Sequence, residues 1–321
     1  MLEAGGELAD ARIVYHTSPT RQGKVIWICH ALTANSDPQD WWPEMVGPGK
    51  TIDPEKDFVV CVNIPGSPYG SESPRSNNPA TGKPYLLQFP AITFRDMVAA
   101  NIAVRKALGV EKIDLLIGSS IGGYQAVEWA VTEPDVFRKC MFCATAPRVS
   151  PYVSATMEAQ RMALETDPTF RKADSINGGQ NGLKCARAQA LISYRCFRGY
   201  QLTQAEENPD TLFAEKAASY ERYQGEKLVK RFFDAYCYYC LCDAVDSHNV
   251  GRGRGGVKEA LGRIKAHCTV VTIYTDGLFP PEEGREWSSW IPDAEYIEIT
   301  SDFGHDGFLL ETEKLSSIIL K

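Results

Sequence analysis

Several features that mark other classes of protein are scarce in this chain. It has only five histidines among 321 residues, and no apolar run approaches the roughly twenty residues that a membrane-spanning helix needs. Lys and Arg number 34 against 41 Asp and Glu, so the net charge is −7. A nucleic acid or an anionic membrane surface would instead favour a basic face. The composition therefore predicts neither a nucleic-acid nor a membrane partner.

One short segment runs against this trend. Residues Gly251 to Gly256 read GRGRGG, a composition found in some RNA-binding segments. Its two arginines lie in an otherwise acidic chain, and glycine-rich segments have a mobile backbone. We interpret it as a flexible surface loop.

The opening of the chain has neither the basic segment nor the apolar core of an export signal. The ten cysteines are therefore expected to be free thiols in a reducing cytoplasm. Cys140 and Cys143 have C-x-x-C spacing, and Cys237, Cys240 and Cys242 form a second cluster. Both groups lie in strongly apolar segments, where burial as small hydrophobic side chains is favoured over metal binding. No bound metal is predicted.

Two patterns divide the chain. Up to about Ala146, apolar strand-like runs alternate with turns and helix-like segments, as in a parallel sheet covered on both faces. Helix-forming stretches then replace the strands, until two further strands and a helix close the chain. The sequence predicts a doubly wound, mostly parallel α/β core from residues 1–146 and 263–321. Residues 147–262 are predicted to form a helical insertion that acts as a lid.

Residues 118–122, Gly-Ser-Ser-Ile-Gly, fit the pattern G-x-S-x-G. A strand-like run precedes them and a helical pattern follows, which is the setting of a nucleophile elbow. The flanking glycines let strand and helix approach closely, so that the central Ser120 is raised above the sheet. At the helix N-terminus, the backbone N–H of Ile121 can stabilise an oxyanion. Ser119 is a rival nucleophile, and a simple packing turn is the alternative to a catalytic one.

A serine nucleophile needs a histidine base and an acid that orients it; after an elbow these follow in the order acid, then histidine. Asp276 ends a late strand, and His305 is the sole histidine after the last strand. Each could separately be a loop residue, but their order favours a triad with Ser120. The second oxyanion donor is expected after an early strand, at the backbone N–H of Leu32. His30, which ends that strand, is expected to be structural.

Six motifs in order extend this interpretation to a family. They read CHALTANSD, GSPYGSESPRSNNPATGKPY, GSSIGGYQAVEWA, YERYQGEKLVKRF, TDGLFPPE and SDFGHDGFLLE. Together they resemble the homoserine O-acetyltransferase family, over nearly the whole chain from about Leu2 to Glu311. These enzymes have the α/β-hydrolase fold, so the resemblance implies that fold with a helical lid.

The resemblance also implies a reaction and its substrates. Ser120 would take an acetyl group from acetyl-CoA, and the side-chain hydroxyl of L-homoserine would then accept it, in a ping-pong step of methionine biosynthesis. Substrate-binding roles carry over onto Thr33, Arg187, Tyr194 and Asp306. An arginine fork matches the α-carboxylate, and an aspartate can pair with the α-ammonium. Acetyl-CoA enters as the acyl-donor substrate, and no bound cofactor is implied.

Some motifs depart from the family pattern. The elbow is GSSIGG where GGSMGG is frequent, and DAYCYYC stands where DANSYL is common. Acetyl or succinyl as the acyl group, and homoserine or serine as acceptor, depend on a few pocket contacts and stay open. An esterase-type hydrolase and a non-catalytic binding protein are two competing interpretations of the same scaffold.

Relatives of this family pair through their helical insertions, so the resemblance implies a homodimer. The aromatic run from Phe232 to Tyr239 is a candidate for part of the paired face. Packing of the lid against the core explains the same residues equally well.

Overall fold

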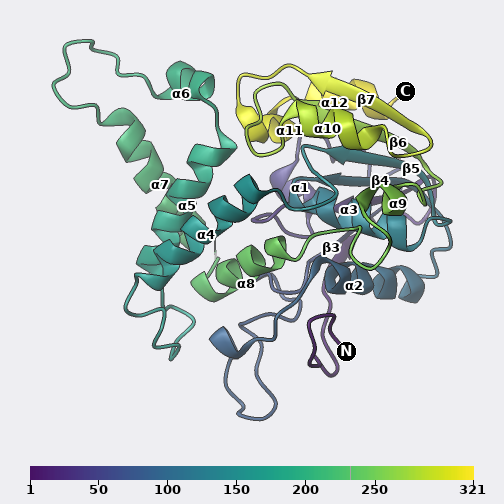
Figure 1. The fold of residues 1–321 in the computed structure, drawn as a ribbon, viewed down its shortest axis with the longest axis horizontal. Coiled ribbons are helices and arrows are strands. Elements are labelled where there is room, and N and C mark those ends of the chain that lie inside the picture. Colours follow the sequence, from purple (N-terminus) through teal and green to yellow (C-terminus); the bar gives the residue numbers. More distant parts are fainter. Residues whose placement is uncertain (232) are drawn as a thin grey trace.

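One seven-stranded sheet forms the centre of the computed structural model, which describes residues 1–231 and 233–321 (Figure 1). The strands lie in the order β1 (Tyr15–Thr17), β3 (Phe58–Val62), β2 (Val25–Cys29), β4 (Ile113–Ser119), β5 (Phe137–Cys143), β6 (His267–Ile273) and β7 (Ala294–Ile299). β1 runs antiparallel to β3, and the other neighbouring strands pair in parallel. The predicted fold class is confirmed.

Both faces of the sheet are buried, because successive side chains of a strand point to opposite sides. On one face, Trp27, Leu116 and Phe142 belong to a core cluster that also includes residues of four helices. These helices are α2 (Phe94–Ala107), α3 (Ile121–Thr132), α9 (Val257–Leu261) and α10 (Pro281–Ser288). The continuous apolar strands of the sequence reflect this two-sided burial.

The opposite face is covered by shorter elements. Ile28 and Met141 pack there with residues that follow α1 (Pro38–Trp41), and with side chains of α11 (Gly307–Leu310) and α12 (Thr312–Ile319). Two 3-10 turns, η1 (Leu86–Gln88) and η2 (Gly304–Asp306), complete the described elements. The second turn leads directly into α11.

Between β5 and α9, the described residues form five helices: α4 (Pro151–Glu165), α5 (Gln180–Tyr194), α6 (Phe197–Gln204), α7 (Lys216–Lys230) and α8 (Ala235–Asp246). Figure 1 shows α4 to α7 standing off one side of the sheet. α5 packs against α4 and α7, and α8 packs against α4. α9 also falls within the predicted insertion of residues 147–262, but it packs in the core cluster of the sheet. None of the described helices has the length and apolar character needed to cross a membrane.

The aromatic run at the start of α8 points inward. Phe233, Tyr236 and Tyr238 are buried, and the Tyr238 hydroxyl donates a hydrogen bond to Gln160 Oε1 at 2.6 Å. These side chains join the helices of the insertion to the core, which is the second of the two interpretations of this run. They do not supply an exposed face, and Phe232 lies outside the described residues.

The cysteines of the two groups singled out in the sequence behave as small hydrophobic residues. Cys140 and Cys143 are buried in β5, and Cys237 and Cys242 are buried in α8 beside the half-buried Cys240. All ten thiols are free. Burial raises the pKa of Cys143 to about 12, so this thiol is neutral at physiological pH.

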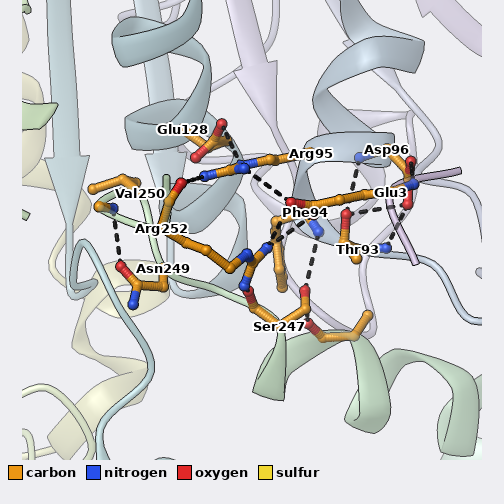
Figure 2. A network of polar contacts seen from close by, with 12 residues as sticks. Glu3, Thr93, Phe94, Arg95, Asp96, Glu128, Ser247, Asn249, Val250 and Arg252 are labelled. Carbon is orange, nitrogen blue, oxygen red and sulfur yellow. Dashed lines mark hydrogen bonds and ion pairs between the residues drawn. The ribbon is translucent and has the colours of Figure 1, made fainter. Parts of the chain in front are cut away.

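The GRGRGG segment is fastened to the core, so its interpretation as a flexible loop is wrong. Arg254 donates two hydrogen bonds, of 2.9 and 2.6 Å, to the carboxylate of Glu128 in α3, whose side chain is only 2% exposed. Figure 2 shows Arg95 beside the same carboxylate, and Arg252 paired with Glu3 at 2.8 Å. A buried carboxylate requires such cations to offset its lost hydration.

Replacement of Glu128 by glutamine tests this network. The change leaves Arg254 and Arg95 without their shared anion, so we expect the free energy of unfolding to fall by about 3 kcal/mol. Urea unfolding of both proteins measures the difference. Glu44→Gln is the control, because Glu44 pairs with Lys50 in solvent, and it should cost less than about 0.5 kcal/mol. Equal costs for the two variants would contradict the role given to Glu128.

Candidate active site

A sharp turn joins β4 to α3 at Ser120. This residue has φ 57° and ψ −130°, a backbone conformation that side-chain-bearing residues rarely adopt. A Cβ on Gly122 would lie 2.0 Å from the carbonyl oxygen of Cys29, and one on Gly118 would lie 2.3 Å from that of Gly122. Both glycines are therefore required by the close approach of β2, β4 and α3. The turn has the geometry of a nucleophile elbow.

The three residues predicted as a triad lie in one chain of hydrogen bonds. Nε2 of His305 is 2.9 Å from the Ser120 hydroxyl, and Nδ1 is 2.7 Å from Oδ2 of Asp276. The other oxygen of Asp276 accepts hydrogen bonds from the backbone N–H groups of Leu278 and Phe279, at 2.8 and 3.1 Å. All three triad side chains are buried. The carboxylate is thus fixed on both oxygens and can orient the imidazole.

The two rival residues do not take part. The Ser119 hydroxyl is buried at the end of β4 and makes no hydrogen bond to His305 or Asp276. His30 is fully buried; its Nδ1 lies 2.8 Å from the carbonyl oxygen of Ala31, and its Nε2 accepts from the Ile64 N–H at 3.2 Å. Burial lowers the pKa of His30 to about 4, so this imidazole is neutral and structural, as expected.

The surroundings of His305 favour its protonated form. Burial by itself lowers the pKa, but the charge and hydrogen bond of Asp276, together with the charge of Asp306, raise it above the ordinary value. An imidazolium formed by proton transfer from Ser120 to His305 would therefore be stabilised.

Two backbone N–H groups are available for an oxyanion. Ile121 is the first residue of α3, and Leu32 lies in the turn after β2. Neither N–H donates a hydrogen bond to any residue that the structure describes. Leu32 and Ser120 line the same cavity. The two predicted donors thus lie on elements that meet at the elbow, with their hydrogen-bonding capacity unused.

A cavity of about 320 Å³ opens at Ser120 and His305. The four residues assigned to substrate binding by resemblance all line it: Thr33, Arg187, Tyr194 and Asp306. Thr33 follows β2, Arg187 and Tyr194 belong to α5, and Asp306 belongs to η2. The structure therefore brings together residues that lie more than two hundred positions apart in the sequence.

The cavity also contains polar residues that were not predicted from the sequence. These are Asp40, Arg195, Gln224, Lys227 and Arg231. A signal was present, because the last three are spaced i, i+3 and i+7, which places them on one side of a helix. The sequence around α7 contains no signal that this side of the helix faces the elbow.

The cavity wall contains several cations, although the chain is acidic overall. The guanidinium of Arg187 lies 5.6 Å from the centre of the Tyr194 ring. Nε of Arg195 lies 2.7 Å from Oδ2 of Asp306. Asp306 makes no side-chain hydrogen bond that would cap α11, so the alternative interpretation of this aspartate as a helix cap is not supported.

Comparisons with known proteins agree with the fold and with the motifs. A family model described as the alpha/beta hydrolase fold matches residues 24–312. A homoserine O-acetyltransferase from Cyclobacterium marinum is 42% identical over 99% of this chain and 91% of its own length. One from Chlorobaculum parvum is 41% identical, with 98% and 89% covered.

Solved structures show the same similarity. The structure of homoserine o-acetyltransferase from Staphylococcus aureus has a TM-score of 0.82 at 30% identity, and the match covers 99% of this chain and 90% of that chain. Esterase E22 has a TM-score of 0.88 at 22% identity, with 99% and 95% covered, a likeness that shows the fold alone.

The pH dependence of serine labelling tests the electrostatics of His305. A fluorophosphonate probe reacts only when neutral His305 can accept the Ser120 proton. Because the pKa of His305 is raised above 6.5, the labelling rate should fall on acidification with a midpoint above that value. Asp276→Asn should shift the midpoint to lower pH, since it removes the largest influence that raises the pKa. Ser119→Ala is the control and should label normally. A rate that does not vary between about pH 5.5 and 8.5 would contradict this assignment.

Proposed function

Since the chain belongs to the homoserine O-acetyltransferase family of the α/β-hydrolase fold, we propose that it transfers an acetyl group from acetyl-CoA to the side-chain hydroxyl of L-homoserine. The transfer proceeds through an acyl-enzyme on Ser120 and belongs to amino-acid biosynthesis. Acetyl-CoA and L-homoserine are its small-molecule substrates, and no bound cofactor is required by any step.

One arrangement carries this proposal. The triad of Ser120, His305 and Asp276 is buried at one end of a cavity. The same cavity contains a cation, Arg187, and an anion, Asp306. A free amino acid presents the complementary pair, an α-carboxylate and an α-ammonium group. Guanidinium groups match carboxylates bidentately, and carboxylates pair with ammonium groups. An ordinary ester substrate would use neither charge.

In the first half-reaction, the Ser120 hydroxyl attacks the thioester carbonyl while its proton moves to Nε2 of His305. The backbone N–H groups of Leu32 and Ile121 stabilise the resulting oxyanion. The carbon–sulfur bond then breaks, and the departing coenzyme A thiol takes the proton from His305. An acetyl-serine ester and a neutral imidazole remain.

In the second half-reaction, the homoserine hydroxyl replaces the thiol. Arg187 holds its α-carboxylate and Asp306 its α-ammonium, while Thr33 and Tyr194 complete the wall around the side chain. The hydroxyl gives its proton to His305 and attacks the acetyl carbonyl. The bond to Ser120 Oγ then breaks, and the proton returns to the serine. Placing the hydroxyl in this way favours transfer over attack by water.

We also propose a homodimer that pairs through the helices between β5 and α9. Exposed apolar side chains support this face: Ile192 of α5, Phe197 and Leu202 of α6, and Tyr223 of α7. α5 and α6 both contact α7, and large exposed apolar side chains on neighbouring helices are typical of interaction surfaces. A cytoplasmic location is proposed as well, supported by ten free thiols.

Release of coenzyme A tests the reaction. We expect fast turnover with acetyl-CoA and L-homoserine, and slow turnover with succinyl-CoA, with L-serine or without an acceptor. Ser120→Ala should reduce transfer by about a thousandfold or more, because the nucleophile is lost. Preference for succinyl-CoA or L-serine would replace the named substrate. Release that does not depend on any acceptor would mean that the enzyme is a hydrolase.

Sedimentation velocity tests the dimer. Phe197 is 81% exposed, and Phe197→Asp places a charge on the proposed paired face, so this variant should sediment as a monomer at concentrations where the wild type is a dimer. Tyr274→Asp is the control, since Tyr274 is also exposed but follows β6 on the core. A wild-type protein at monomer mass over a wide concentration range would refute the dimer.

A further inference from the structure

The chain leaves α5 at Arg195 and passes directly over the loop that precedes η2. A Cβ on Gly304 would lie 2.9 Å from the carbonyl oxygen of Tyr194, so the two backbones are in close contact. The thiol of Cys196 donates a hydrogen bond to the carbonyl oxygen of Asp302 at 3.1 Å. The end of α5 is thus fixed against the loop that carries the catalytic histidine.

At this contact Arg195 makes an ion pair inside the cavity. Its Nε lies 2.7 Å from Oδ2 of Asp306, and the two side chains are 23% and 14% exposed. Arg195 ends α5 with an extended backbone, φ −97° and ψ 166°. The contact to Oδ2 is an ion pair without hydrogen-bond geometry, and none of the described residues donates a hydrogen bond to Oδ1 of Asp306. One oxygen of this carboxylate is therefore held and the other is available.

Asp306 lies in a strongly charged environment. The charged and titratable groups that face it come from α5, η2 and the loop after β6, and they are Arg187, Tyr194, Arg195, His305 and Asp276. Burial raises the pKa of the Asp306 carboxyl, and Arg195 is the largest influence that lowers it. Loss of Arg195 would therefore leave a carboxylate that is both less fixed and more easily protonated.

We propose that Arg195 is a positioning residue for the acceptor amino acid: its ion pair holds the Asp306 carboxylate at the cavity wall, with Oδ1 directed to the α-ammonium group. This inference rests on the proposed function and adds a residue to it. Arg195 acts through Asp306 and touches neither the acetyl group nor Ser120. It serves the second half-reaction only, because acetyl-CoA acylates Ser120 without an ammonium group in the site.

Two substitutions separate this role from a structural one. In Arg195→Gln, the KM for L-homoserine should rise on the order of tenfold or more, since a charge-assisted contact is lost. The burst of coenzyme A released on acylation of Ser120, measured by rapid mixing without acceptor, should change less than about twofold. Arg195→Lys retains the charge without the planar guanidinium group, and its KM for L-homoserine should lie between those of the wild type and Arg195→Gln.

Arg198→Gln is the matched control. Arg198 pairs with Asp302 at 2.8 Å at the same junction, but in a more exposed position. Its loss should leave both the burst and the acceptor KM unchanged. A junction that merely holds the insertion in place would respond to both substitutions alike.

The pH profile gives a second readout. Without Arg195 the pKa of Asp306 rises further, so on acidification its charge is lost at a higher pH. The kcat/KM for L-homoserine should then begin to fall at a higher pH in Arg195→Gln than in the wild type. The profile of the acylation burst, which follows His305, should shift less, because Asp276 influences the pKa of His305 more than Asp306 does.

An unchanged acceptor KM in Arg195→Gln would overturn the inference. So would an equal loss in the burst and in the acceptor step, or the same effect from Arg198→Gln. If the wild type transfers the acetyl group to L-homoserine and Arg195→Gln has the same KM for L-homoserine, only the role of Arg195 is refuted. A wild type that releases coenzyme A to water alone refutes the proposed function and the inference with it.

Discussion

The close approach of β2, β4 and α3 at the elbow is the constraint on which the rest of the site depends. Only glycine fits at Gly118 and Gly122, because any Cβ there would overlap a backbone carbonyl group. This packing fixes the strained conformation of Ser120 at the carboxyl ends of the parallel strands. Leu32 and His305 reach the serine because the loops after β2 and β7 open at the same edge of the sheet. A strained nucleophile is stable here because rigid elements surround it.

The part of the site that follows from this constraint could be predicted from the sequence. G-x-S-x-G between a strand and a helix identifies Ser120, and the order of the late strands leaves Asp276 and His305 as its partners. These motifs are local, and the parallel sheet brings their ends together without further information. Arg187 and Asp306 are different, because only the resemblance to a family assigned them a substrate-binding role. The period of a helix alone cannot show which of its sides faces a distant loop.

Other features could not be predicted because tertiary partners determine them. GRGRGG suggested a mobile loop, but a buried carboxylate at Glu128 fixes Arg254 from more than a hundred positions away. The aromatic run of α8 fitted an interface and a core equally well, and the burial of its side chains in a cluster shared with residues of the α/β core decides for the core. Arg195 stood beside Tyr194 in the sequence without any signal of its role. Its significance comes from a contact with η2 that only the folded chain contains.

A bound amino-acid acceptor would connect α5 to the sheet side of the molecule through its two charges. In the proposed reaction, the α-carboxylate binds Arg187 on α5 and the α-ammonium binds Asp306 on the sheet side. Arg195 already joins α5 to Asp306, so the bound acceptor adds a second electrostatic bridge across the same boundary. An acceptor that lacks either charge would leave this bridge incomplete and the acyl-enzyme more open to water. In the proposed reaction, discrimination between transfer and hydrolysis would then depend on this bridge between α5 and Asp306, since the same triad serves both reactions.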